Sequence, residues 1–291
     1  MKIAVASGKG GTGKTLLATN LFNVIQQSGY AVDLIDCDAE EPNDQQFIKG
    51  KLQGQQLVTQ NIPVIDKDRC TFCGKCQEFC QYNAIIIVRS HQHIRVFEDL
   101  CHDCGACDYA CQSGAISWQA KTTGTLTTYE YNQHSLLVEG RIAVGVYSSV
   151  PLISQAIKGA KPEQITILDA PPGTSCPFIA TVNEADFVVL VTEPTPFGLN
   201  DLKLSVQALQ HLNKPFGVVI NRGGLGNQDV HRFLTENKLP LLDEIPFDRR
   251  IAQLYSEGEL ITNNISAYNK QFQELFIRIK KQIEHDRDSH T

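Results

Sequence analysis

The segment GKGGTGKT, residues 8–15, has the composition of a phosphate-binding loop. It fits G-x-x-x-x-G-K-[ST], in which backbone N–H groups cradle phosphate oxygens, the lysine holds the β- and γ-phosphates and the hydroxyl binds Mg²⁺. It also fits the looser dinucleotide pattern G-x-G-x-x-G, with Asp36 placed to bind a ribose. Only the first pattern uses Lys14 and Thr15, so the sequence favours ATP and Mg²⁺ over NAD or FAD. The predicted nucleotide-binding residues of the loop are Gly8, Gly10, Gly11, Thr12, Gly13, Lys14 and Thr15.

A phosphate-binding loop also needs an acid near the metal, at the end of a hydrophobic strand. The segment ITILDAPPGT, residues 165–174, supplies Asp169 in that setting, followed by a Pro-Pro-Gly turn that ends at Gly173. Both residues are predicted to serve the nucleotide. The dinucleotide interpretation leaves Asp169 without a role, which is a second reason to prefer the phosphate loop.

Eight of the ten cysteines lie between residues 70 and 111, in two runs of C-x₂-C-x₂-C-x₃-C. The runs begin 31 residues apart, and CTFCGKCQEFCQYNAI and CHDCGACDYACQSGAI share Cys, Gly, Gln and Ala-Ile at the same offsets. This is the spacing of bacterial two-cluster ferredoxins, in which each fourth cysteine ligates the other cluster. The predicted ligands of two [4Fe–4S] clusters are Cys70, Cys73, Cys76 with Cys111, and Cys101, Cys104, Cys107 with Cys80.

Two other interpretations of the cysteines stay open. Disulfides are disfavoured because clustered cysteines in a reducing compartment indicate metal or cluster binding. Zinc competes because C-x₂-C pairs also fit tetrahedral Zn²⁺ sites. The ferredoxin pattern has a proline after each fourth cysteine, where this chain has Gln81 and Gln112. Since that proline ligates nothing, the change bears on cluster potential more than on binding.

Alternating strand and helix patterns predict the domain that carries the phosphate loop. KIAVAS, a helical pattern over residues 14–28 and AVDLID form the opening of a parallel α/β sheet. The later predicted strands are RIAVGV (141–146), QITILDA (164–170), DFVVLVT (186–192), PFGVVIN (215–221) and LPLLDEI (239–245), with helices near 152–160, 199–212 and 228–237. We therefore expect a doubly wound, mostly parallel α/β P-loop domain of residues 1–60 and 120–291, with a ferredoxin-like domain of residues 61–119 inserted into it.

The bulk composition excludes several classes of protein. The net charge of −6 argues against a protein that coats nucleic acid, which usually needs a basic face. No apolar run approaches the roughly 18 residues that span a bilayer. Met1 leads directly into a strand pattern with no room for a signal peptide, so we expect a cytoplasmic protein.

The sequence K-G-G-x-G-K-T at residues 9–15 resembles the deviant Walker A ATPases, the MinD, ParA and nitrogenase iron protein superfamily. The resemblance implies that Lys9 reaches across a homodimer to the partner's nucleotide, where an in-trans cation neutralises transition-state charge as an arginine finger does. It also implies that Lys14 and Asp38 serve catalysis, Asp38 by orienting the attacking water. Asp36 and Asn43 would support Asp38, while Asn221, Pro246 and Asp248 would bind the base; a turn-forming asparagine is the simpler alternative for Asn221.

Three further features leave alternatives open. Cys37 is most simply a small buried residue, whereas Cys176 has the offset from Asp169 of a cluster-holding cysteine in the nitrogenase iron protein. A packed thiol is the alternative for Cys176. The C-terminal tail has one apolar helical face, which we expect to dock on the protein's own body and not on membrane, because its polar residues are mixed in charge. Its apolar residues are Phe272, Leu275, Phe276, Ile279 and Ile283, and its charged ones include Glu274, Lys280, Lys281, Glu284, Asp286 and Asp288.

Two functions compete for this combination of motifs. The first is an ATP-hydrolysing homodimer that gates electron transfer through two [4Fe–4S] clusters to a redox or metal-assembly partner, by analogy with the nitrogenase iron protein. The alternative is a carrier or scaffold that delivers clusters to apo-proteins. A carrier needs an exchangeable site, which only Cys176 offers. A third idea, positioning on membrane or DNA, is disfavoured by the charge and the tail.

Overall fold

A single large sheet organises the molecule. The computed structural model describes the backbone of residues 1–289 and the side chains of residues 1–286, and within them the chain forms a nine-stranded sheet and a separate two-stranded hairpin. The strand order is β11-β10-β9-β1-β8-β2-β7-β6-β3, parallel from β11 to β7 and antiparallel beyond. The strands of the large sheet are β1 (Lys2–Ala6), β2 (Val32–Asp36), β3 (Lys51–Ile65), β6 (Ile116–Asn132), β7 (Ser135–Ile142), β8 (Ile165–Asp169), β9 (Phe187–Thr192), β10 (Phe216–Gly223) and β11 (Leu241–Pro246).

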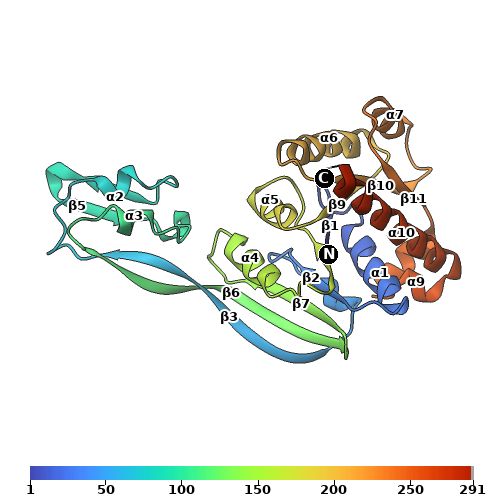
Figure 1. Cartoon of the computed structure of the whole chain (residues 1–291), viewed down its shortest axis with the longest axis horizontal. Coiled ribbons are helices and arrows are strands. Elements are labelled where there is room, and N and C mark those ends of the chain that lie inside the picture. Colours follow the sequence, from blue (N-terminus) through green and yellow to red (C-terminus); the bar gives the residue numbers. More distant parts are fainter. Residues whose placement is uncertain (290–291) are drawn as a thin grey trace.

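Helices cover both faces of the parallel part (Figure 1). Because side chains alternate along a strand, Ile3 and Val5 of β1 face one core and Ala4 and Ala6 face the other. The first core contains α1, α8 and α10, and the second contains α4, α5, α6 and α7. The helices of this part are α1 (Lys14–Gln27), η1 (Asp44–Gln46), α4 (Val150–Lys158), α5 (Cys176–Asn183), α6 (Pro196–His211), α7 (Asp229–Glu236), α8 (Arg249–Ser256), α9 (Ile261–Asn264) and α10 (Ser266–Ser289).

The predicted doubly wound, mostly parallel sheet is confirmed, and one of its predicted strands is wrong. The strand predicted at 141–146 is in fact β7, which ends at Ile142. Beyond it the chain turns, Gly145 adopts φ of +84° and Val144 is fully exposed. The apolar residues 143–146 therefore lie beyond the strand. The neighbouring strands β2 and β6 pair with no residue of this segment later than Ile142.

The antiparallel edge of the sheet extends into a long arm that the sequence patterns did not predict. Strands β3 and β6 pair from Lys51↔Glu130 to Ile65↔Ile116, whereas β7 pairs with β6 only over residues 124–132. The outer part of the β3–β6 ribbon therefore leaves the sheet and carries the cysteine-rich segment at its far end (Figure 1). Pro63 is tolerated because β3 is an edge strand, where a missing N–H donor costs no ladder bond.

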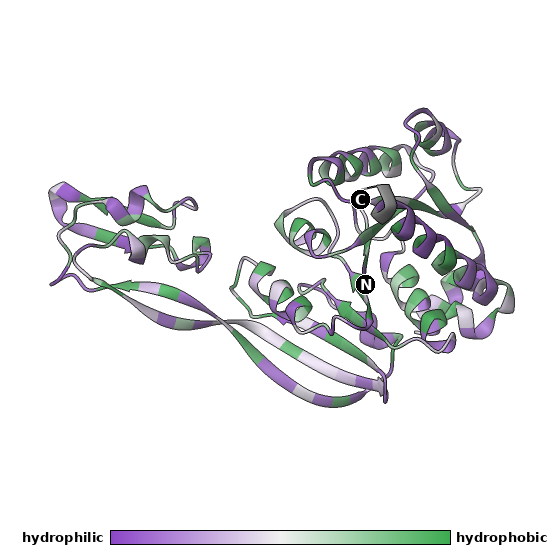
Figure 2. Ribbon diagram, in the orientation of Figure 1, coloured by the Kyte–Doolittle hydropathy of each residue, from purple (hydrophilic) through white to green (hydrophobic). Residues whose placement is uncertain are grey.

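The cysteine-rich segment is built from short elements around a hairpin. They are α2 (Lys75–Glu78), β4 (Ile85–Val88), η2 (Arg89–His91), β5 (His93–Val96), η3 (Glu98–Leu100) and α3 (Ala106–Tyr109). Figure 2 shows that green and purple residues alternate along the ribbon, while the strands of the parallel sheet are mostly green. The parallel strands are hydrophobic throughout because both of their faces are covered.

The C-terminal helix docks on the protein's own body, as predicted. Phe272, Leu275, Phe276, Ile279 and Ile283 are all at most 5% exposed and belong to the core that contains α1. Asp288 lies outside the described side chains.

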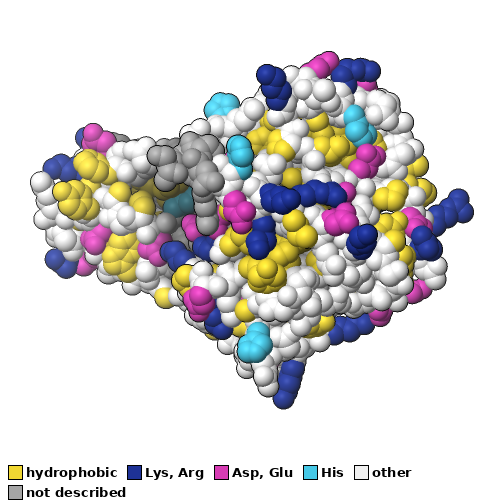
Figure 3. Space-filling model, turned by 45° about the vertical axis from the view of Figure 1, so that its right-hand side comes forward, with side chains coloured by type: hydrophobic (Ala, Val, Ile, Leu, Met, Phe, Trp, Pro, Cys, Tyr) yellow, Lys and Arg dark blue, Asp and Glu magenta, His cyan; other side chains and the backbone are white. Residues whose placement is uncertain are grey.

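On the face of the molecule shown in Figure 3, basic and acidic side chains are interspersed. No helix in the described chain is both long and apolar enough to cross a membrane.

Candidate functional site

The glycine loop joins β1 to α1 at the carboxyl edge of the sheet. Gly13 adopts φ of +101°, and its carbonyl oxygen accepts the first helical bond from Leu17 at 3.0 Å. A side chain at Gly13 would collide with Asn221, since a Cβ there would lie 2.2 Å from Asn221 Nδ2. The same Nδ2 donates to the carbonyl oxygen of Thr12 at 2.8 Å. The loop conformation thus depends on glycine and on a side chain from β10.

A cavity of about 460 Å³ opens beside this loop. One wall is the loop and the start of α1, and the opposite wall is the end of β10, the turn after β11 and helix α8. It collects ten of the residues predicted from sequence: Gly10, Gly11, Gly13, Lys14, Thr15, Asp38, Asn43, Asn221, Pro246 and Asp248. Eight further residues lining it are Leu16, Glu41, Pro172, Arg222, Phe247, Ile251, Ala252 and Tyr255.

The acids predicted to lie near the metal are placed behind the loop lysine. Thr15 Oγ1 donates to Asp169 Oδ2 at 2.8 Å, while Asp169 Oδ1 is buried without a hydrogen-bond partner among the described atoms. Asp36 pairs with Asp169 across strands β2 and β8 and accepts the backbone N–H of Asp38, Asn43 and Asp44 at 2.8–3.1 Å. These bonds shape the turn that brings Asp38 into the cavity.

Burial shifts the pKa of each acid in this group upward. Burial and the neighbouring Asp169 raise the pKa of Asp36 to about 8, against the opposing effect of its three N–H donors. Burial raises the pKa of Asp169 to about 6, with Lys14 and Thr15 opposing the rise. Asp44 is fully buried beside both, and burial raises its pKa well above the usual range of a carboxyl. Because like charges buried together cannot all ionise, part of this group of acids carries protons.

Three predicted residues of the loop, Gly8, Lys9 and Thr12, do not line the cavity. Thr12 is buried. The Lys9 Nζ is 3.5 Å from Oε2 of Glu193, whose Oε1 accepts from Arg222 Nη1 at 2.5 Å. Gly8 packs under α6, where a Cβ would lie 2.4 Å from the carbonyl oxygen of Asp201. Gly173 adopts φ of +90° and donates its N–H to the carbonyl oxygen of Ser7 at 3.1 Å, so the turn after β8 lies against the glycine loop.

Sequence reasoning missed several residues that two signals could have revealed. Glu193 directly follows the buried strand β9, so it lies at the same edge of the sheet as Asp36 and Asp169. The residues Ile251, Ala252 and Tyr255 share one face of α8 at positions i, i+1 and i+4, which would have predicted a helix wall beside Asp248. Asp44 carried no local signal, because its burial depends on the packing of η1 against β7.

The structure groups the eight clustered cysteines into two cavities in the predicted sets. Cys70, Cys73, Cys76 and Cys111 line one cavity together with Ile65 and Ile116 of the ribbon end. The other is lined by Cys80, Cys101, Cys104 and Cys107 with Pro63 and Trp118, which lie nearer the body. We call the first the distal site and the second the proximal site.

The backbone around the two sites repeats as the sequence does. Positive φ angles occur at Phe72, Gly74 and Asn83 around the first run and, 31 residues later, at Asp103, Gly105 and Gly114. Backbone N–H groups donate to Cys80 Sγ from Ala84 at 3.3 Å and to Cys111 Sγ from Ala115 at 3.4 Å, again an equivalent pair. Hydrogen bonds from N–H to sulfur stabilise the thiolate form that binds metal.

Each set of four thiols lines one small cavity. Among residues 1–286, no three His, Cys, Asp or Glu side chains lie close enough together to hold a single metal ion.

The two remaining cysteines differ in exposure. Cys37 is 1% exposed, and burial raises the pKa of its thiol well above the usual range, in agreement with a structural role. Cys176 is exposed at the first position of α5, directly after the turn that contains Gly173.

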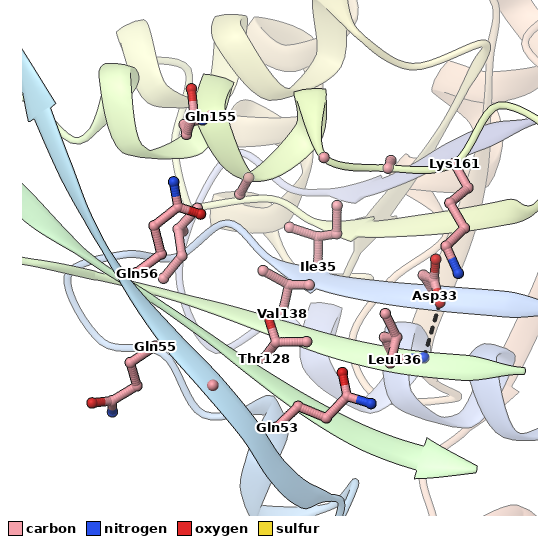
Figure 4. Close-up of a pocket in the computed structure, with 15 residues that line it drawn as sticks. Asp33, Ile35, Gln53, Gln55, Gln56, Thr128, Leu136, Val138, Gln155 and Lys161 are labelled. Carbon is pink, nitrogen blue, oxygen red and sulfur yellow. Dashed lines mark hydrogen bonds between the residues drawn. The ribbon is translucent and has the colours of Figure 1, made fainter. Parts of the chain in front are cut away.

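A second cavity, of about 410 Å³, lies between the base of the ribbon and α4 (Figure 4). In it the Lys161 side chain points towards Asp33, and Asp33 Oδ1 accepts the Leu136 N–H at 2.9 Å. Its lining includes Gln53, Gln55, Gln56 and Gln155 but none of the residues predicted to bind nucleotide or metal.

Comparison with known proteins adds the family. A family model described as the CobQ/CobB/MinD/ParA nucleotide binding domain matches residues 3–261. This chain belongs to the CobQ/CobB/MinD/ParA family. The cell division ATPase MinD of Pyrococcus furiosus has a similar fold, with a TM-score of 0.59 and 20% identity over 96% of this chain and 98% of MinD. The chain therefore has a MinD-like P-loop NTPase fold.

Sequence relatives of this CobQ/CobB/MinD/ParA protein include chains of similar length. An uncharacterized protein of Methanocaldococcus jannaschii is 32% identical over 89% of this chain and 90% of its own length. A protein of Aquifex aeolicus named iron-sulfur cluster carrier protein is 24% identical over 96% of this chain and 66% of its own length.

Proposed function

We propose that this protein binds and hydrolyses ATP as a homodimer, holds two [4Fe–4S] clusters on its arm and delivers iron–sulfur clusters to acceptor proteins. The observation that carries the proposal is the presence, on one chain, of a MinD-type nucleotide cavity and two four-thiol cavities. Relatives named as cluster carriers favour delivery over the electron transfer that the sequence first suggested.

The nucleotide would lie with its phosphates on the glycine loop and its base between Asn221 and the turn Pro246–Asp248. Loop N–H groups and Lys14 would hold the β- and γ-phosphates. Thr15 and Asp169 fit Mg²⁺, because Asp169 Oδ1 is a buried oxygen left without a partner among the described atoms. The ion would neutralise phosphate charge when bound. Asp38 extends into the cavity from the turn held by Asp36 and would orient the attacking water.

Lys9 supports the homodimer part of the proposal. Within one chain it reaches Glu193 and not the nucleotide cavity, so it contributes nothing to its own site. Across a dimer it would neutralise charge on the partner's γ-phosphate, with Glu193 released to Arg222 alone. ATP binding would then change the position of the turn that carries Gly173 and Cys176.

The exchangeable site of a carrier would be built on Cys176. Its thiol is exposed, and it follows the turn whose Gly173 N–H contacts the glycine loop, which links it to the nucleotide. In a symmetric dimer two copies of Cys176 would provide two thiolates for a cluster in transit. The eight thiols of the arm are instead arranged for stable binding.

A cluster-transfer assay tests this function. Purified anaerobic protein loaded with clusters is mixed with an apo-enzyme that needs a [4Fe–4S] cluster, with and without MgATP, and the acceptor's activity is followed. We expect transfer that depends on MgATP and is lost in Cys176→Ala, while ATP hydrolysis is kept. The neighbouring Ser175→Ala is the matched control and should transfer normally. Equal transfer by Cys176→Ala would contradict the carrier function.

ATP-gated electron transfer is the second candidate, favoured by the ferredoxin-like repetition of the two thiol sites. It predicts that MgATP shifts the midpoint potentials of the arm clusters in an anaerobic EPR titration. Potentials that ignore MgATP, together with efficient cluster transfer, would leave the carrier function alone.

A further inference from the structure

The repeat gives the two thiol sites the same ligands but very different charges. Residues 66–81, around the first run, include three basic and three acidic side chains. The equivalent residues 97–112 include no lysine or arginine and four acidic side chains. The ligand geometry is thus duplicated, while the electrostatic surroundings are not.

Three basic side chains of the cysteine-rich segment lie at the distal site itself. Lys75 lines the distal cavity, and the guanidinium of Arg89 lies over Gly74, 2.3 Å from where a Cβ would be. The guanidinium of Arg69 lies 2.9 Å from the corresponding position of Gly114. The residues 31 positions later are Ala106, Ala120 and Leu100, which carry no charge.

Among the described residues that line the proximal cavity, none is a lysine or an arginine. Of the basic side chains in its vicinity, Lys121 is paired with Glu98 and Asp99 at 3.0 and 3.1 Å, and Arg95 stacks on the Phe97 ring. Asp103 and Asp108 accept hydrogen bonds from the Asn61 N–H and the Trp118 indole, which are neutral donors. The acids around the proximal site therefore keep a net negative field.

Hydrogen bonding to sulfur differs in the same direction. The hydroxyl of Ser113 is 3.5 Å from Cys111 Sγ at the distal site. The equivalent residue at the proximal site, Tyr82, instead stacks on His102 with ring centroids 3.7 Å apart. The aromatic rings of Tyr82 and His102 belong to residues that line the proximal cavity.

We propose that the two cluster sites have unequal reduction potentials and that the distal site takes the first electron. Reduction adds one negative charge to a cluster, so nearby cations and donors to sulfur raise its potential and acids lower it. The proposal rests on the proposed binding of two [4Fe–4S] clusters by the eight thiols.

The positions of the two sites determine in which direction along the arm the proposed difference in reduction potential would drive an electron. The proximal site is the one next to the body, since Gln60 of β3 donates to the Cys101 carbonyl and Tyr147 of the body borders a cavity with residues 95–100. An electron that enters on the body side would move outward and settle at the end of the arm. Redox exchange with a partner protein would accordingly take place at the tip formed by the distal site.

The repeat itself supplies the matched variants for a test. Full-length protein is reconstituted anaerobically, its iron and sulfide are quantified, and it is titrated with dithionite under EPR. We expect two midpoint potentials in the natural sequence. Lys75→Ala should lower only the higher one, and Ala106→Lys should raise only the lower one. A tenfold change in the ratio of reduced to oxidised cluster corresponds to 59 mV for one electron.

Ser113→Ala provides a second, smaller change at the distal site and should also lower the higher potential. Two full clusters with equal potentials, or a lower potential that responds to Lys75→Ala, would overturn the inference and leave the proposed function intact. Protein without eight iron and eight sulfide per chain would overturn the cluster-binding proposal and the inference with it.

Discussion

At the residue scale, the closest packing of like charges is the group of buried acids behind Lys14. Asp36, Asp44 and Asp169 are each at most 2% exposed, and their carboxyl groups share the carboxyl ends of β2 and β8. Like charges buried together cannot all ionise, so part of the group carries protons when no cation is present. Repulsion among these carboxylates therefore lowers the free energy of unfolding when they ionise, and a bound cation would reduce this repulsion.

This repulsion predicts how stability depends on pH without nucleotide. The pKa of Asp36 is raised from 3.8 to about 8 in the folded protein, so its contribution to the free energy of unfolding is fully present below about pH 4 and is lost as the pH rises through about 8. The free energy of unfolding of the nucleotide-free protein should therefore fall as the pH rises from about 4 to about 8.

Asp44→Asn checks this prediction. The substitution replaces an acid whose pKa is raised well above its usual range by an amide of similar size, so it removes a charge that burial disfavours. At pH 8 we expect a melting temperature higher by about 2–4 °C and a weaker pH dependence. The exposed Asp229→Asn is the control, and a lower melting temperature for Asp44→Asn would contradict the prediction.

At the element scale, α10 completes the core on one face of the sheet. Phe272 is fully buried between α10 and the strands, whereas Ile277 on the opposite face is 52% exposed. Phe272→Ala should lower the free energy of unfolding by about 3–5 kcal/mol, because it removes a large side chain and leaves a cavity. Urea denaturation measures this, and Ile277→Ala should change it by less than about 0.5 kcal/mol. A large loss of stability in Ile277→Ala would contradict the assignment of Ile277 to the exposed face of α10.

The arm is an element whose removal is also testable. Gln60 and Lys121 are directly paired across β3 and β6, so residues 61–120 can be replaced by an Asn-Gly turn, which favours a two-residue hairpin. We expect a folded protein that binds ATP and lacks the eight iron ions per chain that the arm would hold. An unfolded product would show that the body depends on the cysteine-rich segment, contrary to its position at the end of the ribbon (Figure 1).

At the scale of the whole molecule, the decisive property is the predicted homodimer. Lys9→Ala should keep ATP binding, since Lys9 does not line its own nucleotide cavity, but should abolish ATP-dependent dimerisation and slow hydrolysis by about 10³-fold, the effect of a cation supplied in trans. Light scattering and phosphate release measure the two losses. Lys2→Ala, which removes another exposed ion pair, is the control. If Lys9→Ala dimerised normally with ATP, the role assigned to Lys9 would be wrong.

The sequence by itself determined the parts of this protein that depend on local pattern. Glycine and lysine spacing indicated the phosphate loop, buried apolar runs indicated the parallel strands, and cysteine spacing indicated the grouping of thiols that the two cavities show. The loop and strand signals are local because each reflects a single turn or strand, and the grouping of the thiols could be read because the cysteine run is repeated 31 residues later.

Only the tertiary structure decided the features that join distant segments. Strands β3 and β6 are rich in Gln and Thr, and most of β3 is exposed, so no hydrophobic pattern identified them. Their pairing with each other creates the arm. The contact of Lys9 with Glu193 and the burial of Asp44 likewise depend on which strand ends meet at the sheet edge. The charges of the two repeats can be counted in the sequence, but which thiol site lies at the tip follows from the register of the ribbon.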